Sequence, residues 1–197
     1  MPDLWLVRHG ETAWSAAGRH TGRTDVPLTP RGEQQGILLR RQLHEQEFSL
    51  VLTSPLRRAR DTCAIAGYGA SAEADADLAE WDYGAYEGRT GAEIRHESAG
   101  WDIWSRGVPG GETAADVGAR ADRVLGRVAS VSGNVALFAH AHLLRILAAR
   151  WLRLEPAAGR HFALATASVS VLGHEGTRPV LRRWNDTSHL NVEETTP

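Results

Sequence analysis

The chain has 197 residues, which is enough for one ordinary globular domain and cramped for two. Hydrophobic residues make up 42% and charged residues 23%, and this composition excludes a disordered or fibrous protein. The formal net charge of −2 gives no general electrostatic reason to expect nucleic acid or an anionic membrane as a partner, although it leaves room for a local basic pocket.

A single cysteine, Cys63, excludes an internal disulfide and is typical of a protein in a reducing cytoplasm. We find no secretory leader and no apolar run long enough to cross a bilayer. We therefore expect a cytoplasmic protein.

The first predicted strand leads directly into the first candidate functional residues. Residues 4–7 form a short apolar run, typical of a strand buried on both faces, and Arg8, His9 and Gly10 follow at once. Ligands bind at the carboxyl ends of strands in open α/β sheets, so this position favours a binding role for Arg8 and His9. The alternative for an isolated pair is a surface loop, and the rest of the chain must decide.

Strands and helices then alternate along the chain. Further strands are predicted at residues 50–53, 74–78, 134–139, 169–171 and 180–184, and helices at 30–43, 56–68, 114–128 and 144–151. Thr29 and Thr113 are typical helix N-caps, and Gly32 and Gly36 predict close packing of the first helix on the sheet. The alternation implies parallel pairing. We expect an α/β three-layer sandwich with a mostly parallel central sheet and helices on both faces.

The segment 80–111 fits this alternation least well. It combines tryptophans, tyrosines and glycines without one clear period, and it ends in a Pro-Gly-Gly sequence. We interpret residues 1–197 as a single domain in which residues 80–111 form a cap-like excursion over the sheet.

Polar side chains follow three of the predicted strands: Arg8 and His9, then Ser54-Pro55 leading to Arg58, then His140. Arg58 lies in the first turn of a helix, where free backbone N–H groups and the helix dipole favour an anion. Arg57 and Arg60 flank it, but consecutive helical residues diverge, and only Arg58 shares a face with Thr62. A solvated basic helix start is the alternative. Two arginines, two histidines and this helix start suit a tetrahedral dianion such as a phosphoryl group.

A histidine in such a cluster can act as a nucleophile. A neutral imidazole attacks phosphorus with one ring nitrogen while a backbone carbonyl holds the other. Nearby arginines help to keep the imidazole neutral and stabilise the transition state. The leaving alkoxide needs a proton, for which Glu80, Asp82 and Glu87 are candidates that position alone does not separate.

Several motifs in order along the chain resemble the histidine phosphatase superfamily, the phosphoglycerate-mutase-like proteins. They are RHGET at residues 8–12, LT at 28–29, SPLRRA at 54–59, LAE at 78–80, PGGET at 109–113 and the late His140. The resemblance implies a phosphoglycerate-mutase-like fold, with His9 as the phosphorylated nucleophile. It also implies that Arg8, Arg58 and His140 form the phosphate pocket and that Glu80 donates the proton.

The same resemblance adds four phosphate- or substrate-binding positions: Ser15, Thr21, Gly22 and Ala141. It is closest to a branch of broad acid phosphatases and sedoheptulose-bisphosphatase-type sugar phosphatases. The sequence departs from the family pattern at Ala139 and Ala141, where Ser and Gly usually flank the histidine, and at Ser15, where the mutases carry Asn. These changes bear on the phosphate contacts.

We therefore expect a phosphomonoester hydrolase that acts through a phosphohistidine on His9, without metal or cofactor, on small phosphorylated metabolites such as sugar phosphates. Its expected partner is that small-molecule substrate, with neither nucleic acid nor membrane, and a homodimer is left open. The alternatives are a phosphoglycerate-mutase-type phosphoryl transfer, a non-catalytic phosphate-binding module, and a zinc hydrolase in which His140 and His142 project from one face of a strand end.

The substrate itself is not specified by these motifs. Four aromatic residues are candidates for a pocket wall, and two basic residues for a second anionic group, although each could equally serve packing or the surface. They are Trp81, Tyr83, Trp101 and Trp104, then His20 and Arg23.

Overall fold

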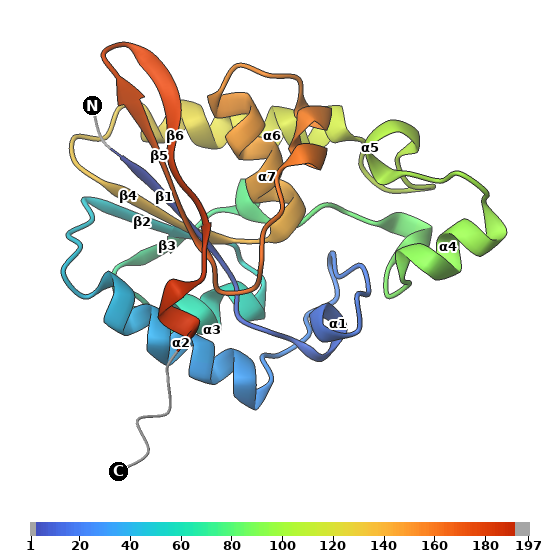
Figure 1. The fold of residues 1–197 in the computed structure, drawn as a ribbon, viewed down its shortest axis with the longest axis horizontal. Coiled ribbons are helices and arrows are strands. Elements are labelled where there is room, and N and C mark those ends of the chain that lie inside the picture. Colours follow the sequence, from blue (N-terminus) through green and yellow to red (C-terminus); the bar gives the residue numbers. More distant parts are fainter. Residues whose placement is uncertain (1–2, 192–197) are drawn as a thin grey trace.

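A computed structural model describes residues 3–191; the ends of the expected domain, residues 1–2 and 192–197, lie outside the described residues (Figure 1). Its centre is a six-stranded sheet with the order β3-β2-β4-β1-β5-β6. The strands are β1 (Leu4–Arg8), β2 (Leu50–Thr53), β3 (Ala72–Ala74), β4 (Val135–Ala139), β5 (Val169–Glu175) and β6 (Arg178–Asp186).

Four strands of the sheet, β3, β2, β4 and β1, are parallel, while β5 and β6 add an antiparallel hairpin. Leu4 pairs with Val135 and Arg8 with Ala139, so β1 and β4 end at the same edge. The chain stays in register just past this edge, because the His9 N–H donates to the Ala139 carbonyl at 3.0 Å. The expected mostly parallel sheet is confirmed, and its carboxyl edge brings the predicted strand ends together.

Helices cover both faces of the sheet. The helices are α1 (Ala13–Ala16), α2 (Pro30–Leu43), α3 (Arg57–Ile65), α4 (Gly91–Glu97), α5 (Ile103–Arg106), α6 (Ala114–Val128) and α7 (Ala141–Trp151). On one face α6 and α7 pack on Leu6, Leu52 and Leu137, and on the other α2 and α3 pack on Val7 and Phe138. Apolar residues therefore line both sides of the sheet. The helices lie on both of its faces, as expected for a three-layer sandwich (Figure 1).

The predicted strand at 74–78 is wrong in its extent. β3 ends at Ala74, and Asp75 instead caps a 3₁₀ turn at Ala76–Leu78, where its carboxylate accepts the Asp77 N–H at 3.0 Å. After this turn the segment 80–111 extends to one side of the sandwich, where it forms a second 3₁₀ turn at Gly84–Tyr86 and the short helices α4 and α5 (Figure 1). Further 3₁₀ turns lie at Pro156–His161 and Ser188–Leu190.

Two glycines place the loop after β1 directly against α2. A Cβ on Gly10 would lie 2.5 Å from the Gly32 carbonyl oxygen, and a Cβ on Gly32 would overlap the Glu11 carbonyl oxygen. Backbone thus approaches backbone without room for a side chain. The predicted packing of Gly36 on the sheet is wrong, because Gly36 contacts the Ile65 side chain of α3.

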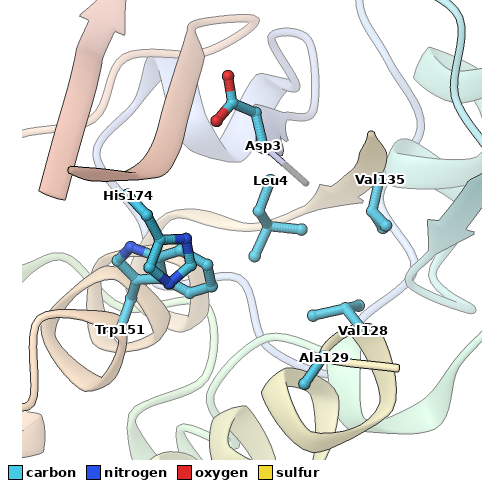
Figure 2. A pocket seen from close by; sticks show the side chains of 7 residues that line it. All are labelled: Asp3, Leu4, Val128, Ala129, Val135, Trp151 and His174. Atoms are coloured by element: carbon cyan, nitrogen blue, oxygen red, sulfur yellow. The ribbon is translucent and has the colours of Figure 1, made fainter. Parts of the chain in front are cut away.

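The opposite, amino edge of β1 and β4 borders an apolar cavity of about 190 Å³. Figure 2 shows its lining side chains, which are Asp3, Leu4, Val128, Ala129, Val135, Trp151 and His174. The apolar ends of β1, β4 and α7 meet here. Among the described residues, no helix has the length and apolar character needed to span a membrane.

Candidate active site

His9 lies one residue past β1 and is 4% exposed. Its Nδ1 is 2.7 Å from the Gly10 carbonyl oxygen. A carbonyl oxygen can only accept, so Nδ1 carries the proton and Nε2 keeps its lone pair. Burial, together with the nearby guanidinium groups of Arg8 and Arg58, holds the pKa of His9 well below its usual range. The ring is therefore a neutral imidazole with an available Nε2, as a nucleophilic role requires.

Backbone carbonyls hold the guanidinium groups of Arg8 and Arg58. Arg8 donates to the Leu164 carbonyl at 2.6 Å, and Arg58 donates to three carbonyls of the segment 21–24 at 2.9–3.1 Å. Burial lowers the pKa of both side chains from the ordinary arginine value. The Nε atoms of both are buried and have no hydrogen-bond partner within residues 3–191. Each arginine thus keeps a donor that the protein does not use.

The choice of Arg58 among the three arginines of α3 is supported by its burial. Arg58 is fully buried, whereas Arg57 pairs with Asp61 at 3.0 Å and Arg60 is exposed. Thr62, on the same face as Arg58, accepts the Gly10 N–H at 2.9 Å and donates to the Arg58 carbonyl at 2.7 Å. This hydroxyl links α3 to the loop that carries His9.

His140 is the N-cap residue of α7 and is fully buried. Its ring centre lies 5.1 Å from that of His9, at an interplanar angle of 58°. Burial first, and then the charge of Arg58, holds the pKa of His140 well below its usual range. Its Nε2 is 2.7 Å from the Ser54 hydroxyl, and its Nδ1 has no partner in the described part of the chain.

Glu80 is 6% exposed, and its carboxylate is held by three backbone N–H groups. Oε1 accepts from Trp81 at 2.9 Å and from Leu143 at 3.0 Å, and Oε2 accepts from His142 at 3.1 Å. Two of these donors belong to the first turn of α7, whose free amides favour an anion. Glu80 therefore sits at the start of the helix that His140 caps.

The other two candidate carboxylates point to other partners. Asp82 forms an ion pair with Arg23 at 2.9 Å and accepts the Gly84 N–H. Glu87 accepts the N–H groups of residues 22 and 24 and so supports the loop whose carbonyls hold Arg58. Of the three carboxylates, Glu80 alone lines the cavity beside His9.

That cavity measures about 120 Å³ and joins residues from several parts of the chain. It is lined by Arg8, His9, Ser15, Gly18, Arg19, His20, Thr21, Glu80, Tyr83, Ala141 and His142. The predicted binding positions 15, 21 and 141 therefore lie on its wall. Gly22, Arg58 and His140 are not among the lining residues: Gly22 contributes a carbonyl to Arg58, and Arg58 and His140 are fully buried beside the cavity. Ser15 also shares a capping box with Thr12, which fixes its hydroxyl at the start of α1.

Five wall residues had no binding role assigned from the motifs or only an open one: Gly18, Arg19, His20, Tyr83 and His142. The Tyr83 hydroxyl lies 2.6 Å from Nδ1 of His142. Burial raises the pKa of Tyr83 and, with the charge of Arg145, lowers that of His142, so both side chains are neutral. The sequence pointed to this pair only through His142, a second histidine two residues after His140.

The geometry assumed for a zinc site is wrong. His142 lies in the first turn of α7 rather than on a strand, so the rings of His140 and His142 take different partners, Ser54 and Tyr83. Within residues 3–191 no group of three or more His, Cys, Asp or Glu side chains is placed to hold a metal ion.

Most of the candidate aromatic wall is packing. Trp81 and Trp104 meet edge to face at 5.7 Å, and Trp104 packs on His142 at 5.2 Å. Trp101 packs on His20 at 5.6 Å. Tyr83 is the member of this group that lines the cavity. Trp101 packs on His20, and Trp81 and Trp104 pack on His142.

The family model for the histidine phosphatase superfamily (branch 1) matches residues 4–187. The chain belongs to this superfamily. An acid phosphatase of Mycobacterium tuberculosis is 43% identical over 176 residues, which cover 87% of this chain and 86% of the relative. A sedoheptulose 1,7-bisphosphatase of Saccharomyces cerevisiae is 36% identical over 185 residues, 78% of this chain and 68% of the relative.

The solved structure of an open reading frame of Mycobacterium tuberculosis superposes with a TM-score of 0.89 at 40% identity, covering 93% of this chain and 97% of that chain. A probable phosphoglycerate mutase of Salmonella choleraesuis is 29% identical over 210 residues, 98% of this chain and 96% of the relative. The phosphoglycerate-mutase-like fold and the phosphatase class expected from the motifs are thereby confirmed.

Proposed function

We propose that the chain hydrolyses small phosphomonoesters through a phosphohistidine formed on His9. The observation that carries this proposal is the tautomer of His9. Its Nδ1–H donates to the Gly10 carbonyl, so Nε2 is an uncharged nucleophile beside the buried cations Arg8 and Arg58. The unused donors of Arg8, Arg58 and His140 then suit the oxygens of a phosphoryl group.

In the first step Nε2 of His9 bonds to phosphorus while the ester P–O bond breaks. The leaving oxygen takes a proton from Glu80. Oε1 of Glu80 already accepts two N–H groups and Oε2 accepts one, so Oε2 has the remaining site for that proton. The arginines bind the equatorial oxygens, where charge is distributed in the transition state.

In the second step a water molecule attacks the phosphohistidine. The Glu80 carboxylate takes a proton from this water, a P–O bond forms and the P–N bond breaks. The products are inorganic phosphate and a neutral His9, and Glu80 is again protonated for the next substrate.

The substrate class that the cavity supports is a small phosphorylated metabolite with hydroxyl groups, such as a sugar phosphate. The outer wall has hydrogen-bonding groups on His20, Tyr83 and His142. Among the described lining residues, Arg19 is its one arginine or lysine besides Arg8. The names of the acid phosphatase and sugar-bisphosphatase relatives agree with this class.

Phosphoglycerate mutase activity is the second candidate, favoured by the name of one relative. A mutase must shield its phosphohistidine from water. Here Gly18 and Arg19 at the cavity wall are exposed, which favours access of water and therefore hydrolysis.

The test is an activity screen with a panel of phosphate monoesters, including sugar bisphosphates and phosphoglycerates, in the presence of a chelator. We expect turnover and an acid-labile phosphoryl adduct in a quench experiment. Activity that zinc restores after chelation would indicate a metal hydrolase instead. Binding of phosphate without turnover or adduct would indicate a non-catalytic module, and transfer to added phosphoglycerate in preference to water would indicate a mutase.

We also infer a cytoplasmic location. Cys63 is a buried free thiol, and burial raises its pKa to about 12. A buried thiol of low reactivity is compatible with a reducing compartment.

A further inference from the structure

Ser54 touches His140 but has not been given a role of its own in the site. It follows β2 directly and is fully buried, and its N–H donates to the Phe138 carbonyl at 2.9 Å. Its hydroxyl oxygen accepts the Leu56 N–H at 3.2 Å and lies 2.7 Å from Nε2 of His140. The side chain therefore bridges the start of α3 and the start of α7.

The hydroxyl has one proton to donate, and its placement decides the state of the imidazole. The pKa of His140 is held well below its usual range, so the ring carries one N–H. Within residues 3–191 the Ser54 hydroxyl has no acceptor other than Nε2 of His140. If Ser54 donates to Nε2, the ring proton lies on Nδ1. If Nε2 donates instead, the Ser54 proton is buried without an acceptor, which costs free energy.

We infer that Ser54 is a positioning residue that donates to Nε2 of His140 and so fixes the tautomer with the proton on Nδ1. Because the two ring nitrogens point in roughly opposite directions, this Nδ1–H faces away from Ser54. Nδ1 is the buried atom for which residues 3–191 supply no partner. His140 then offers the transferring phosphoryl group a neutral N–H donor rather than a repelling lone pair. This role in phosphoryl binding depends on the proposed function, whereas the tautomer does not.

The two histidines consequently hold their ring protons in complementary ways. The Gly10 carbonyl accepts a hydrogen bond from Nδ1–H of His9, which leaves a nucleophilic lone pair on Nε2. Ser54 donates to Nε2 of His140 and leaves a donor on Nδ1. One ring attacks phosphorus and the other stabilises its oxygens, although both are neutral imidazoles 5.1 Å apart.

The direct test is ¹⁵N NMR of the histidine side chains in the complete protein, because the nitrogen shifts distinguish the two neutral tautomers. Comparison with His140→Gln assigns the signals. In the wild type we expect the proton of His140 on Nδ1. Ser54→Ala should move it toward Nε2, and Ser54→Thr, which keeps the hydroxyl, should restore it. A wild-type proton on Nε2, or a tautomer that Ser54→Ala leaves unchanged, would overturn the inference.

Kinetics supply the second measurement. Ser54→Ala should lower kcat/KM for phosphate monoesters about 10- to 100-fold, the range expected for one hydrogen bond to a charged group, and Ser54→Thr should recover most of it. Thr53→Val is the matched control, since it removes the neighbouring buried hydroxyl, which contacts the Ser54 carbonyl and not the ring. An equal loss in Thr53→Val would indicate a structural effect. A wild type with the expected tautomer but no phosphatase activity would reject the proposed function alone.

Discussion

The two edges of the parallel sheet carry opposite chemistry on the same elements. β1 begins at Leu4, in the apolar cavity, and ends at Arg8 beside His9 (Figure 2). β4 begins at Val135 in the same cavity and leads to His140. The carboxyl edge gathers polar groups because parallel strands all end there and helices begin there, with free amides that favour anions. The cavity at the amino edge is lined mainly by apolar side chains, with Asp3 and His174 beside them. We therefore expect changes at one edge to affect catalysis and changes at the other to affect stability.

The largest expected effect is that of His9→Ala at the polar edge. Turnover should fall by a factor on the order of 10⁴ or more, because the nucleophile is lost, while the fold is retained. Steady-state assays and acid-quench labelling measure this. His174→Ala, a histidine at the apolar cavity, is the matched control and should keep activity. Appreciable phosphatase activity in His9→Ala would contradict the mechanism.

Glu80→Gln should have the next largest effect, and one that depends on the leaving group. Alkyl phosphates should lose about 10²- to 10⁴-fold in kcat, whereas aryl phosphates, which scarcely need a proton, should lose far less. Paired assays on the two substrate classes measure this ratio, with Asp82→Asn as a control that should show no such dependence. Equal losses on both classes would place the acid elsewhere.

At the apolar edge Leu4→Ala should lower the free energy of unfolding by about 2–5 kcal/mol, because Leu4 is only 2% exposed and its truncation enlarges the cavity that it lines. Activity per folded molecule should be unchanged. Urea unfolding and kinetic assays test the two halves of this statement, with Leu154→Ala, an exposed leucine, as a control of small effect. A loss of activity in folded Leu4→Ala would show that the two edges are coupled.

The last prediction concerns acid pH. The pKa values of His9, His140 and His142 are all held well below the usual range, chiefly by burial. Below about pH 6.5 these histidines bind protons in the unfolded chain, whereas in the folded chain they stay neutral. Stability should therefore fall with pH by about 1.4 kcal/mol per pH unit for each histidine until the folded rings titrate, and it should be level above pH 7.5.

Urea titrations between pH 5 and 8 measure that slope. His142→Gln should reduce it by one histidine's share, whereas Leu4→Ala should shift the curve down without changing its slope. A wild-type protein whose stability is level from pH 8 to pH 5 would contradict the burial of these rings as neutral groups.

The parts that could be predicted from the sequence are those whose cause is local. An apolar run followed by Arg8 and His9 predicts a strand end, and the divergence of helical neighbours singles out Arg58. The choice of Glu80 came from the family resemblance alone, because the amides that hold it lie 62 and 63 residues further on. The contact of Tyr83 with His142 joins residues that are 59 positions apart, so no periodic pattern in the sequence predicts it. The strand predicted at 74–78 failed because a capping side chain, Asp75, ended it early.

The contact of Gly10 with Gly32 limits how this protein can evolve. A side chain at either position would displace backbone, so neither codon can change first without moving the loop that carries His9. The outer wall is less restricted where it is formed by exposed loop residues, as it is at Arg19. Descendants of this chain can therefore acquire new substrates by drift in those loops, while selection keeps the two glycines as they are.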